Sequence, residues 1–154
     1  MHKRIIQPAH QEVDQGWLNL DGLAEVEISS EDPAEPIESA LLLGRSSGWR
    51  AAGPGKQTIR LLFAHPQRLR RIRLSFIEPL KRRTQEYVLR WSPDGGQSYR
   101  EIVRQQWNFS PDGTTSETED HHVELAAVTV LELIINPDIS AGDAFASLAQ
   151  LRLA

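Results

Sequence analysis

The sequence predicts an all-β protein, an antiparallel β-sandwich or jelly roll with one short helix. Three observations support this fold class. Apolar and polar residues alternate with a period of two over much of the chain from residue 57 onward. Turn-forming segments separate the alternating stretches, and Ser-Pro-Asp-Gly occurs twice, at 92–95 and 110–113. Several short strands with turns at regular spacing are typical of sandwiches and jelly rolls.

The first elements in chain order are a weak strand and a helix. Residues 24–29 alternate weakly, and residues 36–43 form the only plausible helix, with proline at its start. Residues 51–55 are rich in glycine and proline and are expected to form a loop. Two strongly alternating segments follow, 57–63 and 70–76, and each places three large apolar residues on one face.

The second half of the chain continues this pattern. Tyr87, Leu89 and Trp91 form a third apolar set, and residues 99–109 form the next strand, which suggests a meander. Residues 128–135 are apolar on nearly both faces, which indicates a central strand that ends at Asn136-Pro137. Leu148, Leu151 and Leu153 are expected to close the sheet as a last strand.

Size and charge limit the possible functions. A chain of 154 residues fits one domain, with the sandwich at 24–153 and an N-terminal extension at 1–23 that Trp17 and Leu18 could anchor. The net charge of −4 argues against nucleic acid as a partner. The chain has no cysteine, no apolar run long enough for a signal peptide and no membrane span, so we expect a cytoplasmic protein without membrane partners.

Five segments, taken in order, resemble the discoidin family, also called coagulation-factor type C or galactose-binding-like domains. They are an Ala-Leu-rich helix followed by Gly48-Trp49-Arg50-Ala51, then 55–63, 66–74, 85–95 and 146–153. The likeness covers roughly residues 24 to 153. It implies an eight-stranded antiparallel jelly roll whose loops at one end bind glycans, lipids or proteins, although fold alone does not fix function.

The resemblance also bears on cofactors. Many members of the family hold a calcium ion with an Asp that precedes a Gly after the helix and with a Glu near the C-terminus. The corresponding positions here are Leu43 and Gln150. Because calcium prefers several oxygen ligands that include carboxylates, we predict that this calcium site is absent and that the protein has no cofactor.

Catalytic and metal sites find little support in the sequence. Gly44-Arg45-Ser46-Ser47-Gly48 matches a nucleophile elbow, but that motif requires a strand before it and a helix after it, so we predict no catalytic residue. Glu117, Glu119 and His121 would share one strand face, but carboxylates on a solvated strand are more common than a metal site. No carboxylate pair suitable for acid–base chemistry is evident.

The predicted function is non-catalytic binding, with a carbohydrate as the first candidate. Arg82 and Arg83 lie in a basic loop and could bond hydroxyls or acidic groups. Trp107 could stack on a sugar ring and Asn108 could bond its hydroxyls. Alternatively, Trp107 and Phe109 point inward as strand residues. A protein-interaction or self-associating domain is the alternative function, because acidic residues dominate the first third of the chain and basic residues cluster at 68–83.

Overall fold

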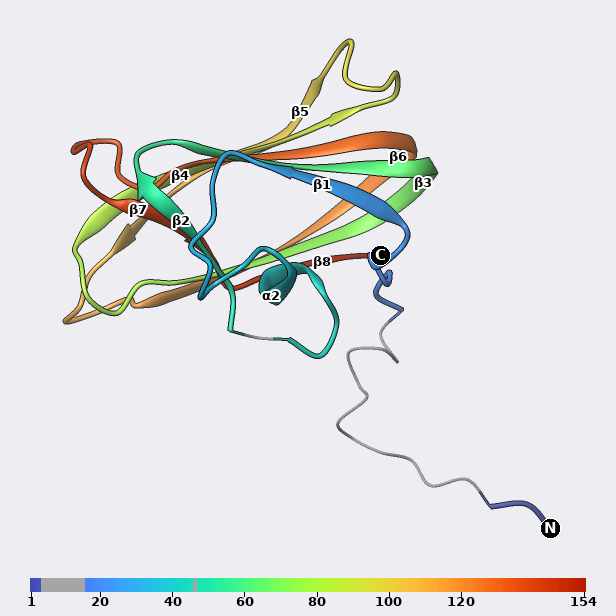
Figure 1. The fold of residues 1–154 in the computed structure, drawn as a ribbon, viewed down its shortest axis with the longest axis horizontal. Helices are drawn as coiled ribbons and strands as arrows, with labels where there is room; N and C mark the ends of the chain where they lie inside the picture. Colours follow the sequence, from blue (N-terminus) through green and yellow to red (C-terminus); the bar gives the residue numbers. More distant parts are fainter. Residues whose placement is uncertain (4–15, 46) are drawn as a thin grey trace.

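Antiparallel strands make up most of the molecule, which is a computed structural model that describes residues 1–3, 16–45 and 47–154 (Figure 1). The elements in chain order are β1 (Ala24–Ile28), α2 (Glu38–Leu41), β2 (Trp49–Pro54), β3 (Gln57–Ile77), β4 (Arg83–Ser92), β5 (Arg100–Phe109), β6 (Ser116–Asn136), β7 (Phe145–Leu148) and β8 (Gln150–Leu153). The predicted all-β jelly-roll sandwich is confirmed.

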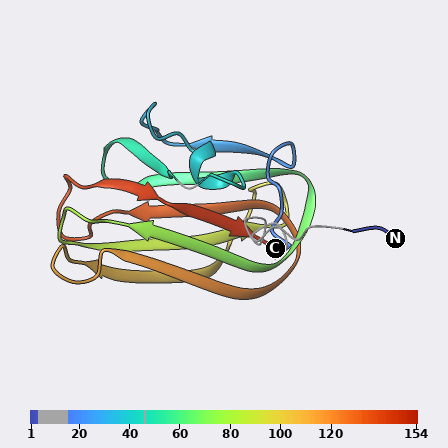
Figure 2. The same ribbon diagram turned by 90° about the horizontal axis from the view of Figure 1, so that it is seen from below.

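Two long strands, β3 and β6, contribute to both layers of the sandwich. Residues 57–62 of β3 pair with residues 130–135 of β6 in a large sheet of order β1-β3-β6-β4-β5. Residues 71–77 of β3 pair with residues 116–122 of β6, and β8 pairs with this second half of β3. Strand β2 pairs with β7, which immediately precedes β8. Figure 2 shows the strands running along the long axis of the molecule.

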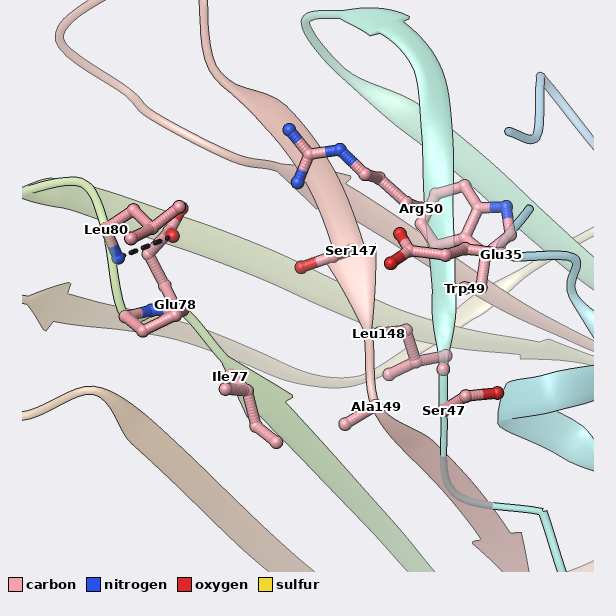
Figure 3. Close-up of a pocket in the computed structure, with 12 residues that line it drawn as sticks. Glu35, Ser47, Trp49, Arg50, Ile77, Glu78, Leu80, Ser147, Leu148 and Ala149 are labelled. Carbon is pink, nitrogen blue, oxygen red and sulfur yellow. Dashed lines mark hydrogen bonds between the residues drawn. The ribbon is translucent and has the colours of Figure 1, made fainter. Parts of the chain in front are cut away.

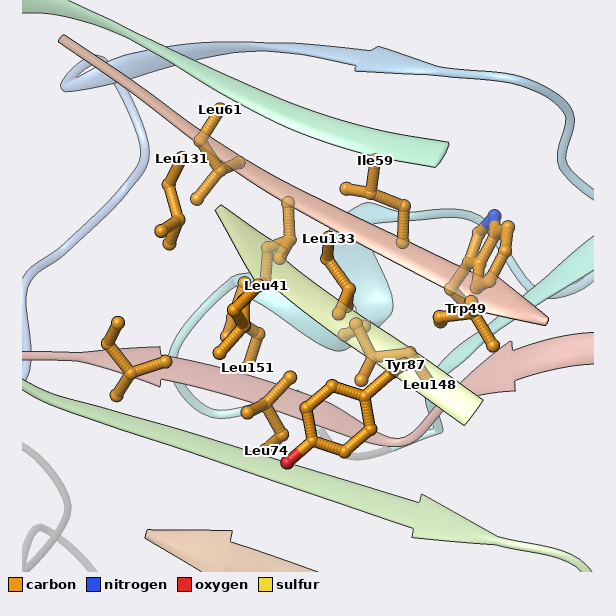
Figure 4. Close-up of a cluster of buried hydrophobic side chains, with 14 of the residues drawn as sticks. Leu41, Trp49, Ile59, Leu61, Leu74, Tyr87, Leu131, Leu133, Leu148 and Leu151 are labelled. Atoms are coloured by element: carbon orange, nitrogen blue, oxygen red, sulfur yellow. The ribbon is translucent and has the colours of Figure 1, made fainter. Parts of the chain in front are cut away.

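The hydrophobic core lies between these layers (Figure 4). Alternation along β3 and β6 directs Ile59 and Leu133 into it from the large sheet, and Leu74 and Leu151 enter from the opposite layer. All four side chains are buried. Each large apolar side chain that is fully buried contributes about 1.5–3 kcal/mol, so period-two patterning supplies the main stabilisation of the sandwich.

The predicted strands 57–63 and 70–76 are in fact one strand. Strand β3 runs from 57 to 77, and its register with β6 shifts three times between Leu62 and Arg71. Pro66 lies in this irregular region, where its missing N–H disrupts no ladder hydrogen bond. The predicted meander is wrong, because β6 lies between β3 and β4 in the sheet. Sequential alternation does not reveal which strands pair.

Two shorter elements also differ from the prediction. Residues 51–55, expected to form a loop, belong largely to β2, which pairs with β7. The helix spans four residues, Glu38–Leu41, and ends where Leu42 adopts an extended backbone. Leu151 and Leu153 lie in the last strand, β8, as predicted, whereas Leu148 belongs to β7 and pairs with β2. The predicted central strand at 128–135 lies within β6, which ends at Asn136. The glycine and the proline of β2 suggested a loop, but the segment is a strand whose pairing with β7 is irregular.

Trp17 and Leu18, which precede β1, both contact the sandwich. Trp17 is buried, and the guanidinium carbon of Arg71 lies 4.6 Å from the centre of its ring. The backbone N–H of Leu18 donates to the carbonyl of Leu153 at 2.7 Å. Across the described residues, no helix is long and apolar enough to cross a membrane.

Candidate functional site

A pocket of about 280 Å³ opens between the β2–β7 pair and the connection from β3 to β4 (Figure 3). Its lining combines charged, hydroxyl and apolar side chains. The lining includes Glu35, Arg50, Ile77, Glu78, Leu80 and Ser147. Ligand pockets of drug-sized molecules measure about 300–1,000 Å³, so this pocket suits a smaller molecule such as a single sugar ring.

The polar wall of the pocket comes from β2, β7 and the segment before α2. Alternation in β2 buries Trp49 and leaves Arg50 exposed, directly opposite Ser147 of β7. The guanidinium carbon of Arg50 lies 5.1 Å from the centre of the Phe145 ring, a cation–π contact that orients the side chain. Neither Arg50 nor the half-buried Glu35 forms an ion pair with a described residue. Both charges therefore remain available for a ligand.

The apolar wall comes from the end of β3 and the turn that follows it. Ile77 is 55% exposed and Leu80 is 82% exposed. Glu78 holds this turn in place. Its Oε1 accepts a hydrogen bond of 2.8 Å from Nε of Arg83, its Oε2 accepts one from the Leu80 N–H, and its own N–H donates to the Thr115 carbonyl. The exposed apolar side chains are thus presented by a fixed turn.

Arg83 lies next to this pocket but does not face solvent. It is 3% exposed, and its Nη1 donates to Oε1 of Gln85 at 2.9 Å and to the Pro137 carbonyl at 2.7 Å. Its guanidinium carbon also lies 4.9 Å from the centre of the Phe109 ring. Arg83 therefore fixes Glu78 and the strand end, whereas the neighbouring Arg82 is exposed.

Trp107 and Asn108 lie on β5, opposite the first residues of β4. Asn108 points outward and its Oδ1 accepts a hydrogen bond of 2.6 Å from Oγ1 of Thr84. Trp107 pairs with Gln85 on the inner face but is 37% exposed, because β5 is the outermost strand of the large sheet. Strand pairing thus brings the four predicted residues to one region, but none of them lines the pocket.

Sequence reasoning did not identify Glu35, Arg50 or Leu80 as site residues. Arg50 belongs to the Gly48-Trp49-Arg50-Ala51 segment, which indicates only a family likeness, and Leu80 belongs to no alternating segment. Two signals were available in the sequence. Leu80 is an apolar residue in the loop sequence Pro79-Leu80-Lys81, and Arg50 is a charged residue next to Trp49. These residues line one pocket only because the β2–β7 pair and the β3–β4 turn lie next to each other in the folded protein.

The region expected to hold calcium in the family has an unusual arrangement. Leu43 follows α2 and has no ligand atom in its side chain, and Gln150 begins β8. Several backbone carbonyls at the end of α2 accept hydrogen bonds from the guanidinium of Arg152. The residues present do not fit a calcium ion, because two carboxylates are missing and a cation already contacts the carbonyls.

The Glu117, Glu119 and His121 set does share one strand face, and it faces inward. Glu117 is 5% exposed, which contradicts the expectation of a solvated carboxylate strand and of no distinctive carboxylate pair. The hydroxyl of Tyr87 in β4 contacts the Glu119 carboxylate and lies 2.9 Å from Nε2 of His121. Within the described ranges, no group of three His, Cys, Asp or Glu residues is arranged to hold a metal ion. Ser46 lies outside the described residues.

Comparisons with solved structures identify the fold. A family 32 carbohydrate-binding module of C. perfringens NanJ, solved with galactose, matches with a TM-score of 0.62 and 14% identity over 89% of this chain and 96% of that one. CBM32-3 from a family 31 glycoside hydrolase of Clostridium perfringens gives 0.64 and 16% over 96% and 98%. Reduced XRCC1, solved bound to the DNA polymerase β catalytic domain, gives 0.63 and 14% over 90% and 97%.

Neither the family models nor the curated proteins matched this chain. The structural matches nevertheless confirm the fold that the discoidin-like segments predicted. The chain has the same antiparallel jelly-roll fold as these carbohydrate-binding modules. At such low sequence identities the likeness establishes architecture, and function has to be argued from the residues of the site.

Proposed function

We propose that this protein is a non-catalytic glycan-binding module and that a small saccharide binds in the pocket beside β2 and β7. The observation that carries the proposal is that Arg50 and Glu35, two charged groups without an ion-pair partner among the described residues, lie in one pocket with the exposed side chain of Leu80. Solved proteins of this fold include modules in complex with galactose and with an unsaturated mannuronic acid, which supports a saccharide ligand.

The chemistry of the pocket suits a sugar ring. A carboxylate such as that of Glu35 accepts hydrogen bonds from sugar hydroxyls, and a guanidinium such as that of Arg50 donates to ring or hydroxyl oxygens. The Ser147 hydroxyl can do either. Leu80 would contact the C–H face of the ring. The pocket holds one cation and one anion whose charges cancel in sum, so a neutral saccharide suits it better than a strongly charged ligand.

The residues first singled out in the sequence have different roles in this proposal. Arg83 acts as a positioning residue, because it fixes Glu78 and thereby the turn that carries Leu80. Arg82, Trp107 and Asn108 extend the binding region along the β4–β5 side of the same end, where a longer glycan chain would continue. Trp107 would stack against a sugar ring there, since its ring is partly exposed.

The test is calorimetric titration of a saccharide panel, with galactose and its uronic acid first, into wild type and three variants. We expect R50A and E35Q to weaken binding about tenfold or more, the effect of losing one charge-assisted hydrogen bond. The control R68A removes an arginine that pairs with Glu124 on the surface, and it should bind as wild type does. Absence of any saccharide binding, or equal binding by R50A, would refute the proposal.

A protein partner is the second candidate, because an exposed apolar side chain and two exposed cations adjoin at the β3–β4 turn, Leu80, Lys81 and Arg82. A protein of the same fold, XRCC1, is solved with a protein partner. Sedimentation velocity at several salt concentrations tests self-association through this turn. A monomer at every salt concentration would exclude self-association. A salt-sensitive oligomer that dissociates in the L80A variant would favour self-association over glycan binding.

We also propose that the fold needs no calcium and no other cofactor. The reason is chemical: the side chain of Leu43 offers no oxygen ligand, and the nearby carbonyls already accept hydrogen bonds from Arg152. A guanidinium supplies fixed positive charge and directed donors, which are the two contributions that a bound cation makes to a cluster of carbonyl oxygens.

A further inference from the structure

A group of ionisable side chains lies between the layers at the start of β6, away from the pocket lining. The first half of β6 pairs only with β3 in the described structure, so its other side is an open edge. Glu117, Glu119 and His121 point from this edge toward β4. Tyr87 of β4 meets them, and the ring of Phe76 stacks on Tyr87 with 5.3 Å between centroids.

The hydrogen bonds define the role of each group. The Tyr87 hydroxyl has one proton, which it donates to the Glu119 carboxylate, so His121 Nε2 donates to the hydroxyl oxygen at 2.9 Å. Glu119 is therefore the anion of the cluster. Burial, followed by the interaction with Glu119, raises the pKa of Tyr87, which keeps the hydroxyl protonated as this donor.

Glu117 is the exception in this network. It is nearly fully buried, and both of its carboxylate oxygens lack a hydrogen-bond partner in the part of the chain that the structure describes. A buried carboxylate anion without partners is costly, and a second anion two residues away on the same face adds repulsion. The same carboxyl group is stable there when protonated. Burial, and after it the neighbouring Glu119, raises the pKa of Glu117 to about 8.

Few other charges face Glu117. On β6 they are Glu119 and His121, and on β4 they are Tyr87 and, at the strand end, Arg83, whose charge is paired with Glu78. Strand β3 presents Leu74 and Phe76, and β5 presents Gln105 and Trp107, none of which is charged. Nε2 of His121 lies 3.3 Å from Oε2 of Glu119, and Arg83 is paired with Glu78, so the two cationic groups among these residues are engaged with other carboxylates and not with Glu117.

The position of Glu117 links it to the pocket. It pairs with Phe76 in the β3–β6 ladder, and the next pair is Ser116 with Ile77. The Glu78 N–H then donates to the Thr115 carbonyl at 2.7 Å. Ile77 and Glu78 both line the pocket. A disturbance at the first residues of β6 therefore reaches the apolar wall of the pocket through two adjacent backbone contacts.

We propose that Glu117, buried in its protonated form beside the Glu119 anion, acts as a pH-sensitive switch on the pocket. With the proton present, Glu117 is neutral and the start of β6 is closed on the sandwich. Loss of the proton in mildly alkaline solution places two anions side by side, and the edge of β6 separates from β4. The turn at 77–80 loosens with it. The effect on ligand binding rests on the proposed function, whereas the structural switch does not.

The experiment is hydrogen exchange at about pH 6 and about pH 9 on wild type, E117Q and E124Q, corrected for the intrinsic pH dependence of exchange. Glutamine imitates protonated Glu117, so E117Q should retain protection at both pH values. E124Q is the matched control, because Glu124 lies on the exposed face of the same strand. In wild type and in E124Q, protection at 76–80 and 116–119 should fall at least about tenfold at the higher pH. Equal protection of wild type at both pH values would overturn the proposal.

Two further measurements test the switch and the proposed function separately. Carboxyl carbon NMR of wild type should show one glutamate that titrates near the alkaline range, and its absence would overturn the switch even if E117Q failed to fold. Saccharide titration at the same two pH values should show weaker binding by wild type at the higher one and no change in E117Q. If no saccharide binds at either pH while exchange responds as expected, the proposed function fails and the switch stands.

Discussion

Arg152 in β8 donates a hydrogen bond of 3.0 Å from Nη1 to the backbone carbonyl of Ala40 in α2, 112 residues earlier in the chain. The same guanidinium also reaches the carbonyls of Leu41, Leu42 and Arg45. The last carbonyls of a helix have no partners within it, and a buried one must be satisfied from elsewhere. Arg152 thus attaches the helical turn to the last strand.

Substitution of Arg152 by methionine should lower the free energy of unfolding substantially. The side chain is almost fully buried, and its removal would leave several carbonyls unsatisfied at about 1–3 kcal/mol each. We expect a total loss of about 3 kcal/mol or more in urea unfolding. R68M, which alters an arginine that is mostly exposed, should change it by less than about 0.5 kcal/mol. Similar values for both variants would contradict this role.

Calcium should have no effect on thermal stability. A ligand that binds only the folded state raises Tm, and here the carbonyls near α2 are already bonded by Arg152. Differential scanning calorimetry after treatment with EDTA, with and without added calcium in the millimolar range, should give Tm values within about 1 °C of each other. A saturable increase of several degrees would show that the protein does hold a stabilising calcium ion.

The sequence predicted the parts of this fold that depend on local alternation. The apolar pattern of residues 128–135 predicted a central strand covered on both faces, and in the structure this segment lies between β3 and β4. Pairing partners and bent strands could not be predicted, because they depend on contacts between distant residues. The pocket has the same origin: Arg50 and Leu80 line one pocket only through the register of β2 with β7 and the turn that Arg83 fixes.

Burial was the second property that the sequence did not reveal. Arg83 was interpreted as a ligand-binding arginine of a basic loop, but Glu78, Gln85 and Pro137 use its donors inside the protein. Glu117 was interpreted as solvated, although its side chain lies between two layers. A charged residue in an alternating strand has the same pattern whether its face is covered or open, so only the tertiary structure separates the two cases.

The buried Glu132 should contribute strongly to stability. It lies on the outer face of the large sheet, fully covered, and accepts hydrogen bonds of 2.7 Å from Nε of both Arg60 and Arg90. E132Q would leave two cations without their shared anion, and breaking a buried ion pair costs about 3–5 kcal/mol. The matched control E27Q removes an exposed carboxylate 3.6 Å from Arg60, and denaturant unfolding should show less than about 1 kcal/mol for it.

The first Ser-Pro-Asp-Gly turn should be sensitive to acid. The hydroxyls of Ser98 and Ser92 and the Ser98 N–H donate to the Asp94 carboxylate, and these bonds lower the pKa of Asp94 to about 2. A carboxyl group with a lowered pKa stabilises the folded state above its unfolded pKa, and this contribution disappears as the pH falls from about 4 to about 2.

D94N should remove that part of the acid dependence of stability, measured as Tm against pH. The same substitution at Asp112, the equivalent position of the second turn, is the matched control, since Asp112 is exposed. We expect the curve of D112N to follow wild type and the curve of D94N to be flatter between about pH 4 and about pH 2. Parallel curves for all three proteins would show that the Asp94 hydrogen bonds do not persist in solution.

Leu80 offers a substitution that separates binding from stability. Its side chain is 82% exposed, so L80A removes little buried area and should change the free energy of unfolding by less than about 0.5 kcal/mol. If the pocket binds a sugar ring, the lost apolar contact should weaken saccharide affinity, by about tenfold for roughly 1.4 kcal/mol. W107A is the informative comparison, since Trp107 lies on β5 outside the pocket. L80A should weaken the binding of a short saccharide and W107A should not, whereas both substitutions should weaken the binding of a longer glycan. If W107A weakened the binding of a short saccharide and L80A did not, the binding site would lie on β5 and not in the pocket.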